Sequence, residues 1–262
     1  AVTARSCIFG QAMRFELGRK GPKHPERPHL MPGICGIRAA HPQTGFTNPA
    51  RLLHICSMNV LVWFKRDLRV CDHPALAIAV QLGAVLPLYI VEPDYWQLPD
   101  TSARQWAFTA ECLTDLRDQL AAAGAPLVVR VGEAVEVLDR LCRQRGITRI
   151  ISHEETGNLW TFARDRRVAA WARAAGIEWT EVAQSGVVRR LGNRDGWAAR
   201  RDRFVTAEVG DMPQTILAVA GVEPGLIPSA KSMKMMDDRC PHRQLGGRAQ
   251  GLALQDSFLR SR

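Results

Sequence analysis

Residues 59–79 have the sequence NVLVWFKRDLRVCDHPALAIA, in which an apolar run is followed directly by a cluster of charge. The run from Val60 to Phe64 lacks the polar alternation of a half-exposed strand, so it predicts a strand buried on both faces, as in a parallel sheet. A helix is expected next, because Asp72 is a suitable N-cap, Pro74 suits the first turn and ALAIAV supplies an apolar body. The charges from Lys65 to Asp72 would then follow the carboxyl end of a buried strand, where open α/β sheets bind ligands.

The alternation of strand and helix continues to residue 182. Further strands are expected at AVLPLYIVE (84–92), LVVRV (127–131), RIISHEE (149–155) and IEWTEV (177–182), with helices over 103–124, 134–146 and 158–176. Strict alternation with short connections predicts an α/β fold, a Rossmann-like doubly wound five-stranded parallel sheet with helices on both faces. Pro87 conflicts with this pattern, because a proline inside a strand favours a sheet edge or a bulge.

The basic charge of the chain is concentrated at one end. The net charge is +9, and residues 1–57 hold eight Lys or Arg against Glu16 and Glu26, which is +6 and leaves +3 for the rest. Most of the basicity therefore lies outside the α/β region. Residues 1–57 show no helical stripe or strand alternation, so we expect a disordered or non-native N-terminal extension, with a basic arm or an organelle presequence as alternatives.

Composition limits the class of protein further. At 46% apolar residues the chain can bury a full domain core, and no apolar stretch approaches the length of a membrane span. Seven cysteines without a C-x-x-C or a paired Cys/His spacing indicate neither a disulfide framework nor a zinc site, and His153 beside two glutamates has poor ligand spacing. We expect a cytoplasmic monomer without membrane association.

The chain after the α/β pattern divides into three parts. GWAARRDRFVTAEV (196–209) predicts one more helix, and the α/β domain is expected over 58–207. Residues 208–245 are rich in Pro, Gly, Met and charge and are expected to be an interdomain linker. Residues 246–262 have the pattern of a first helix that opens a second domain, here truncated.

Several blocks of the sequence resemble one protein family. WFKRDLRVCDHPAL (63–76) resembles the first strand, turn and helix of the DNA photolyase and cryptochrome family. HEETGN (153–158), the following ARDRRVAAWARAAGIEWTEV and RDGWAARRDRF look like a bacterial branch of that family. GGRAQGLALQDSFL (246–259) is similar to the entry into its helical flavin domain, so the resemblance covers residues 58–262, roughly the first half of a member.

The resemblance implies a light-driven enzyme of two domains, an α/β domain that often bears an antenna chromophore and a helical domain that holds FAD. Such a protein is a deoxyribodipyrimidine photolyase, which repairs pyrimidine dimers in DNA. FAD and DNA contacts are then expected in the full-length member and not in this chain, so no catalytic residue is assigned. The alternatives are a cryptochrome-type blue-light photoreceptor and a free-standing nucleotide-binding module; the latter predicts a glycine-rich phosphate loop, and none follows any strand.

Polar residues follow three of the predicted strands and should face one crevice: Lys65 and Arg66, Glu92, and Glu154 and Glu155. A planar heterocycle could be held there by an arginine and carboxylates. The resemblance places positions matching Arg66 and Ile90 to Glu92 near a deazaflavin. The candidate antenna site is therefore Arg66, Ile90, Glu92 and Glu154, for a deazaflavin, pterin or flavin chromophore.

The alternative is structural. Arg66 with Glu92, or Arg69 with Asp72, would form ion pairs that stabilise a domain contact. Asp67 and Arg69 are expected to provide partners for the backbone amides and the charges of the turn after the first strand. The run from Arg164 to Arg167 is expected to be a solvated helix face.

Overall fold

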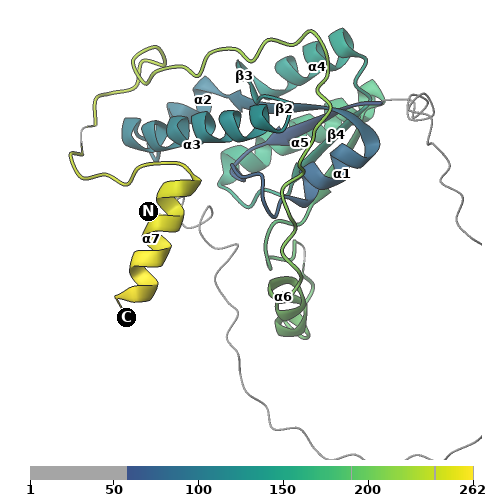
Figure 1. Cartoon of the computed structure of the whole chain (residues 1–262). Coiled ribbons are helices and arrows are strands. Elements are labelled where there is room, and N and C mark those ends of the chain that lie inside the picture. The colour runs from purple at the N-terminus through teal and green to yellow at the C-terminus, as the bar shows by residue number, and fades with distance from the viewer. Residues whose placement is uncertain (1–57, 190, 239, 262) are drawn as a thin grey trace, which may run out of the picture.

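The computed structural model describes residues 58–189, 191–238 and 240–261. The predicted N-terminal extension, residues 1–57, lies outside the described residues. The described part is built around one sheet with helices on both of its faces, and two further segments extend from it (Figure 1).

The sheet has five strands, all parallel. They are β1 (Met58–Phe64), β2 (Gly83–Val91), β3 (Val128–Val131), β4 (Arg149–His153) and β5 (Glu178–Val182), in the order β3-β2-β1-β4-β5. The prediction of a doubly wound five-stranded parallel sheet is confirmed. The order reverses between β1 and β4, and that switch point is where such sheets form a ligand crevice.

Helices cover both faces of β1, which explains its unbroken apolar run. Val60, Val62 and Phe64 pack with α1 (Pro74–Leu82) and α3 (Ala103–Ala122). Leu61 and Trp63 pack with α4 (Ala134–Arg145) and α5 (Leu159–Ala175). A strand with a helical layer on each side has no polar face to present, so alternation disappears from its sequence. The short helix α2 (Pro93–Trp96) was not predicted.

The start of α1 differs from the prediction. The N-cap is His73, whose side chain accepts a hydrogen bond from the Leu76 amide, and not Asp72. Asp72 lies one residue earlier in the left-handed region, with φ 50°, a conformation that Asp tolerates better than most residues. There its amide donates to the Gly210 carbonyl at 2.7 Å, so Asp72 joins the turn to a distant segment.

Pro87 lies in an internal strand, between β1 and β3, and not at an edge. The Val85 amide points away from β1, to the Leu217 carbonyl, so the nitrogen of Pro87 two residues later points to the same side. The pairing of β2 with β3 begins only at Leu88. Pro87 therefore removes no hydrogen bond between strands. Proline is tolerated in this internal strand because its nitrogen lies before the start of the pairing with β3.

Residues 210–247, here called the belt, pack across the α/β domain instead of hanging free. The Ile216 amide donates to Ala123, Ala218 forms a parallel bridge with Val85, and the Val129 amide donates to Pro224. Ile216, Val219 and Met233 are buried in the two cores. The belt follows the arm, residues 183–209, which contains α6 (Trp197–Val205), and leads into α7 (Arg248–Arg260) (Figure 1). Within the described residues no helix is both long and apolar enough to cross a membrane.

Candidate functional site at the carboxyl edge of the sheet

A cavity of about 810 Å³ opens at the carboxyl ends of β1, β2 and β4, beside the switch point of the sheet. That volume is within the range of small-molecule sites in proteins. The strand ends supply Trp63 to Arg66, then Tyr89, Ile90 and Glu92, and finally Glu155 to Asn158. Helix α3 closes one side with Gln105, Phe108 and Thr109. The cavity thus combines an apolar wall with charged groups from three strand ends.

An ion-pair network forms the charged wall. Arg66 donates to Glu155 through Nε at 2.7 Å and to the Tyr95 hydroxyl at 2.7 Å. Arg164, from α5, donates to Glu92 at 3.0 Å and also to Glu155. The side chain of Arg164 is only 7% exposed, so the prediction of a solvated face is wrong at this residue. The reason is its position: Arg164 lies on the buried face of α5, four residues before Val168, and its guanidinium reaches carboxylates at two strand ends.

The network holds more carboxylates than cations. Four cations, Lys65, Arg66, Arg164 and Arg189, face five acids: Glu92, Glu154, Glu155, Asp165 and Glu181. Burial would raise the pKa of Glu155, but Arg164, Lys65 and Arg66 outweigh it and hold that pKa below its usual value.

Glu92 is the carboxylate left with a deficit of positive charge. Burial raises its pKa to about 7, and Arg164 offsets this only in part, because its guanidinium is shared with Glu155 and Asp165. One oxygen of Glu92, Oε1, is buried and has no hydrogen-bond partner within the described part of the chain. Glu92 is therefore the acid of the network whose charged form is least favoured.

The predicted site residues separate into two groups. Arg66, Ile90 and Glu92 line the cavity, whereas Glu154, directly after β4, does not; its carboxylate lies 3.8 Å from Arg189 Nε. Arg66 and Glu92 are not paired with each other, since each has a different partner. Arg69 donates from Nε to the backbone carbonyl of Asp72 at 3.1 Å and forms no ion pair with the Asp72 carboxylate.

Sequence reasoning missed part of the aromatic and α3 wall. Tyr95 lies in the unpredicted α2, where its ring contacts Trp160 at 5.4 Å and its hydroxyl orients Arg66. Thr109 lies on the buried stripe of α3, three residues after Trp106 and four before Leu113, but it is polar, and Phe108 lies beside that stripe, so apolar periodicity gave no signal that either residue lines a cavity. The short PDYW segment directly after a strand end was the one available sign of a ligand wall.

The fold and the cavity define a doubly wound α/β domain with a ligand crevice at its switch point. The family model described as DNA photolyase matches residues 60–192, half of the chain, and the chain belongs to this family. The match begins in β1 and ends within the arm, so it contains the three strand ends of the cavity.

Curated relatives carry both photolyase and cryptochrome names. Cryptochrome DASH of Natronomonas pharaonis is 28% identical over 225 residues, which is 76% of this chain and 46% of that protein. Deoxyribodipyrimidine photo-lyase of Salmonella typhimurium is 40% identical over 96 residues, 34% of this chain and 20% of that one. The chloroplastic/mitochondrial cryptochrome DASH of Arabidopsis thaliana is 35% identical over 103 residues, 37% of this chain and 18% of that protein. The chain thus spans less than half of the length of these relatives.

Solved structures with the same fold include two photolyases. A bacterial class III photolyase from Agrobacterium tumefaciens has a TM-score of 0.61 at 21% identity, over 78% of this chain and 45% of that one. An archaeal photolyase from Sulfolobus tokodaii, solved with two FAD molecules and the implication of a novel light-harvesting cofactor, has a TM-score of 0.57 at 22% identity, over 75% and 46%.

Proposed function

We propose that this chain is the chromophore-binding α/β part of a photolyase-type flavoprotein and that the carboxyl-edge cavity holds an antenna chromophore. The observation that carries the proposal is the cavity of about 810 Å³ at the switch point, which is lined by an arginine, two glutamates and aromatic side chains. The presence of a second FAD in the Sulfolobus tokodaii relative is consistent with a chromophore besides the catalytic flavin.

The residues of the cavity fit a planar heterocycle. Such rings combine apolar faces with polar edges that carry N–H groups and carbonyl oxygens. Tyr95, Trp96 and Phe108 supply apolar walls, and the carboxyl group of Glu92 can donate to a ring carbonyl when protonated or accept from a ring N–H when ionised. Arg66, exposed over 28% of its side chain, provides a fixed positive charge for an anionic edge or tail.

These contacts indicate which roles the chromophore and the protein would each have in the cavity. A bound chromophore would absorb light and pass the excitation energy on, while the protein binds and orients it. Arg164 and Glu155 keep Arg66 and Glu92 in fixed positions, and the buried ends of β1 and β2 exclude water from the inner side of the ring. Repair of pyrimidine dimers would require FAD and DNA contacts from the remainder of a full-length protein.

A cryptochrome-type photoreceptor is the second candidate, since relatives named cryptochrome DASH match the chain. The two candidates share the α/β cavity. They are separated by assaying a full-length version of this protein for light-dependent repair of pyrimidine dimers in single- and double-stranded DNA.

The cavity is tested by filling it from α3. We expect the purified chain to bind at least one of FMN, FAD, a pterin and a 5-deazaflavin, as measured by quenching of ligand fluorescence. Thr109 lines the cavity and its hydroxyl is already satisfied by the Gln105 carbonyl, so Thr109→Trp adds bulk without leaving a polar atom unpaired. Affinity should fall by about a hundredfold or more, which is roughly 2.8 kcal/mol.

Thr114→Trp is the matched control. Thr114 lies on the same helix with the same type of hydrogen bond, to the Ala110 carbonyl, but it is exposed and outside the cavity. It should bind ligand like the wild type. Equal affinity of all three proteins would place the chromophore elsewhere, and no binding by the wild type to any probe would remove the proposed function.

A further inference from the structure

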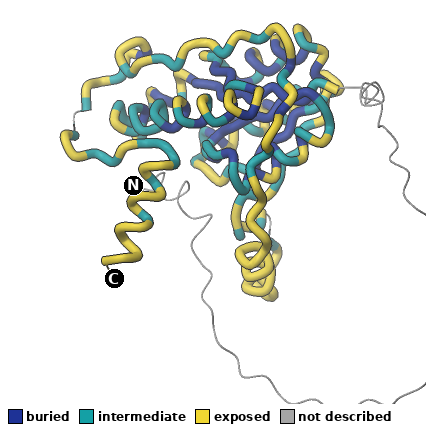
Figure 2. The backbone as a smooth tube through the Cα atoms, in the orientation of Figure 1, coloured by how far each residue is buried: buried dark blue, intermediate teal, exposed yellow. Residues whose placement is uncertain are grey.

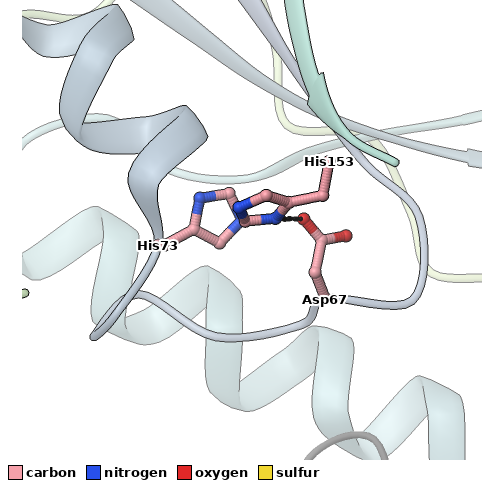
Figure 3. A group of neighbouring side chains, drawn as sticks. All are labelled: Asp67, His73 and His153. Atoms are coloured by element: carbon pink, nitrogen blue, oxygen red, sulfur yellow. Dashed lines mark hydrogen bonds and ion pairs between the residues drawn. The ribbon is translucent and has the colours of Figure 1, made fainter. Parts of the chain in front are cut away.

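Three buried polar side chains meet behind the cavity, from the turn after β1, the start of α1 and the end of β4 (Figure 3). Asp67 Oδ2 lies 2.8 Å from His73 Nε2 and 2.6 Å from His153 Nδ1. The other oxygen, Oδ1, accepts the Lys65 amide at 2.8 Å. None of the three residues is more than 3% exposed. One carboxylate thus joins two strand ends and a helix start.

The hydrogen bonds fix the proton on each ring. The Leu76 amide donates to His73 Nδ1 at 2.9 Å, so that nitrogen carries no proton and the neutral ring must hold its proton on Nε2, which donates to Asp67. His153 faces the same carboxylate oxygen with Nδ1, and this contact is attractive only if Nδ1 is protonated. The remaining nitrogen, His153 Nε2, is then a bare acceptor, buried and without a hydrogen-bond partner in the described ranges.

A metal ion does not fit this arrangement, although two histidines and a carboxylate are a common ligand set. A metal on His73 Nε2 would displace the proton there. Its Nδ1 already accepts the Leu76 amide, so the ring would have to become an imidazolate. Histidines that bind metals normally donate a hydrogen bond from their second nitrogen, and His73 does the reverse.

We propose that Asp67, His73 and His153 form a buried proton-binding site that locks the carboxyl edge of the sheet at neutral pH and releases it when a further proton binds. The further proton binds His73 Nδ1, the nitrogen that accepts the Leu76 amide at 2.9 Å. A proton there would turn the acceptor that caps α1 into a donor facing that amide, and it would charge a buried ring whose centroid lies 4.3 Å from that of His153. The extra proton is therefore held better by the open form than by the closed one.

The charges around the cluster give the direction of the pH effect. Burial lowers the pKa of His73, the hydrogen bond to Asp67 offsets this in part, and His153 and Arg69 add to the lowering. The pKa of His73 in the folded protein is below the ordinary 6.5. The contribution of neutral His73 to folding stability is therefore fully present above pH 6.5 and declines as the pH falls below it. Burial alone would raise the pKa of Asp67, but the bonds from both histidines hold it well below 3.8, so Asp67 does not titrate in this window.

The lock is connected to the cavity through the chain itself. Arg66 directly precedes Asp67, Glu155 lies two residues after His153, and Arg66 and Glu155 are paired at 2.7 Å in the cavity wall. Release of the lock would free both segments that present this pair. The proton site stands independently of any chromophore, and only this link rests on the proposed function.

The test uses the full chain labelled with ¹⁵N. Correlation of ring nitrogens with ring protons by NMR at pH 8 should show one buried histidine protonated on Nε2 and one on Nδ1, assigned to His73 and His153 by loss of each signal in His73→Asn and His153→Asn. Between pH 7 and pH 5 the thermal unfolding midpoint of the wild type should fall by about 3 to 5 °C more than that of His73→Asn, whose side chain can still cap a helix but does not titrate. His242→Asn, which changes an exposed histidine, should keep the wild-type pH dependence.

Three results would overturn the proposal. The absence of any histidine protonated on Nδ1 at pH 8 contradicts the tautomer argument, and that result can be read from the wild type alone if a variant does not fold. Equal pH dependence of the wild type and His73→Asn removes the lock. Binding of one Zn²⁺ or Co²⁺ per chain that raises the unfolding midpoint of the wild type, but not that of His153→Asn, would make the cluster a metal site. If the lock is confirmed but ligand affinity does not fall between pH 7 and pH 5, only its link to the cavity is lost.

Discussion

The arm and the belt are two consecutive segments outside the alternating strands and helices. The arm has the more regular secondary structure, but the belt is the more buried of the two. The arm contains the regular helix α6, yet none of its described residues is buried (Figure 2). The belt contains no helix or strand of the sheet, yet it buries Ile216, Val219 and Met233 and hydrogen-bonds to both neighbouring layers.

The difference shows that regular structure and integration into a fold are separate properties. A helix satisfies its own backbone groups and can form away from the core. The belt must satisfy its backbone on other elements, so its hydrogen bonds to Ala123, Val85 and Val129 fix it against α3, β2 and β3. The belt should therefore contribute more to stability than the arm does.

The largest expected effect follows from replacing Ile216 with alanine. Its side chain is 2% exposed and packs in the core shared by α1 and α3, so Ile216→Ala should lower the free energy of unfolding by about 2 to 5 kcal/mol, measured by urea denaturation. Leu217→Ala is the matched control, because the next residue is 62% exposed and its loss should cost less than about 0.5 kcal/mol. Similar values for the two variants would mean that the belt is not packed as described.

The same comparison explains what could be predicted from the sequence. The α/β fold was predictable because each strand and helix carries its own periodic signal, as in the run from Val60 to Phe64. The belt was predicted as a linker because its contacts are single apolar residues among Pro and Gly, which have no period. Pro87 was flagged correctly as unusual, but its tolerance depends on where the ladder with β3 begins, and no local pattern gives that register.

The candidate site was predictable only where it follows strand ends. Arg66, Ile90 and Glu92 line the cavity because parallel strands bring their carboxyl ends together. The choice between Glu154 and Glu155 required the exact end of β4, and a shift of one residue turns a side chain to the opposite face. Arg164 was missed because it stands in a charged run, although it lies four residues before Val168 on the buried face of α5.

An effect of intermediate size is expected from two glycines that have the same backbone conformation, one in the belt and one in the arm. Gly225 in the belt has φ 75° and Gly196 at the start of α6 has φ 72°, so alanine at either pays about 1 kcal/mol for the left-handed region. A Cβ at Gly225 would also lie 2.5 Å from the Val129 carbonyl oxygen, whereas one at Gly196 would meet nothing within 4 Å. We expect Gly225→Ala to destabilise the domain by about 2 to 3 kcal/mol and Gly196→Ala to leave its global stability nearly unchanged. A larger effect at Gly196 would reverse the assignment of the two segments.

The smallest effect is expected within α6 itself. Phe204 is 41% exposed and α6 has no buried residue, so Phe204→Ala should change the free energy of unfolding by less than about 0.5 kcal/mol. Leu116→Ala on α3, where the side chain is 1% exposed, provides the contrast at about 2 to 5 kcal/mol. Amide hydrogen exchange separates local from global opening: the amides of α6 should exchange with a free energy far below that of α3, because a helix without tertiary contacts opens alone. If α6 instead exchanges only with global unfolding, the arm is as integrated as the belt, and the distinction between them fails.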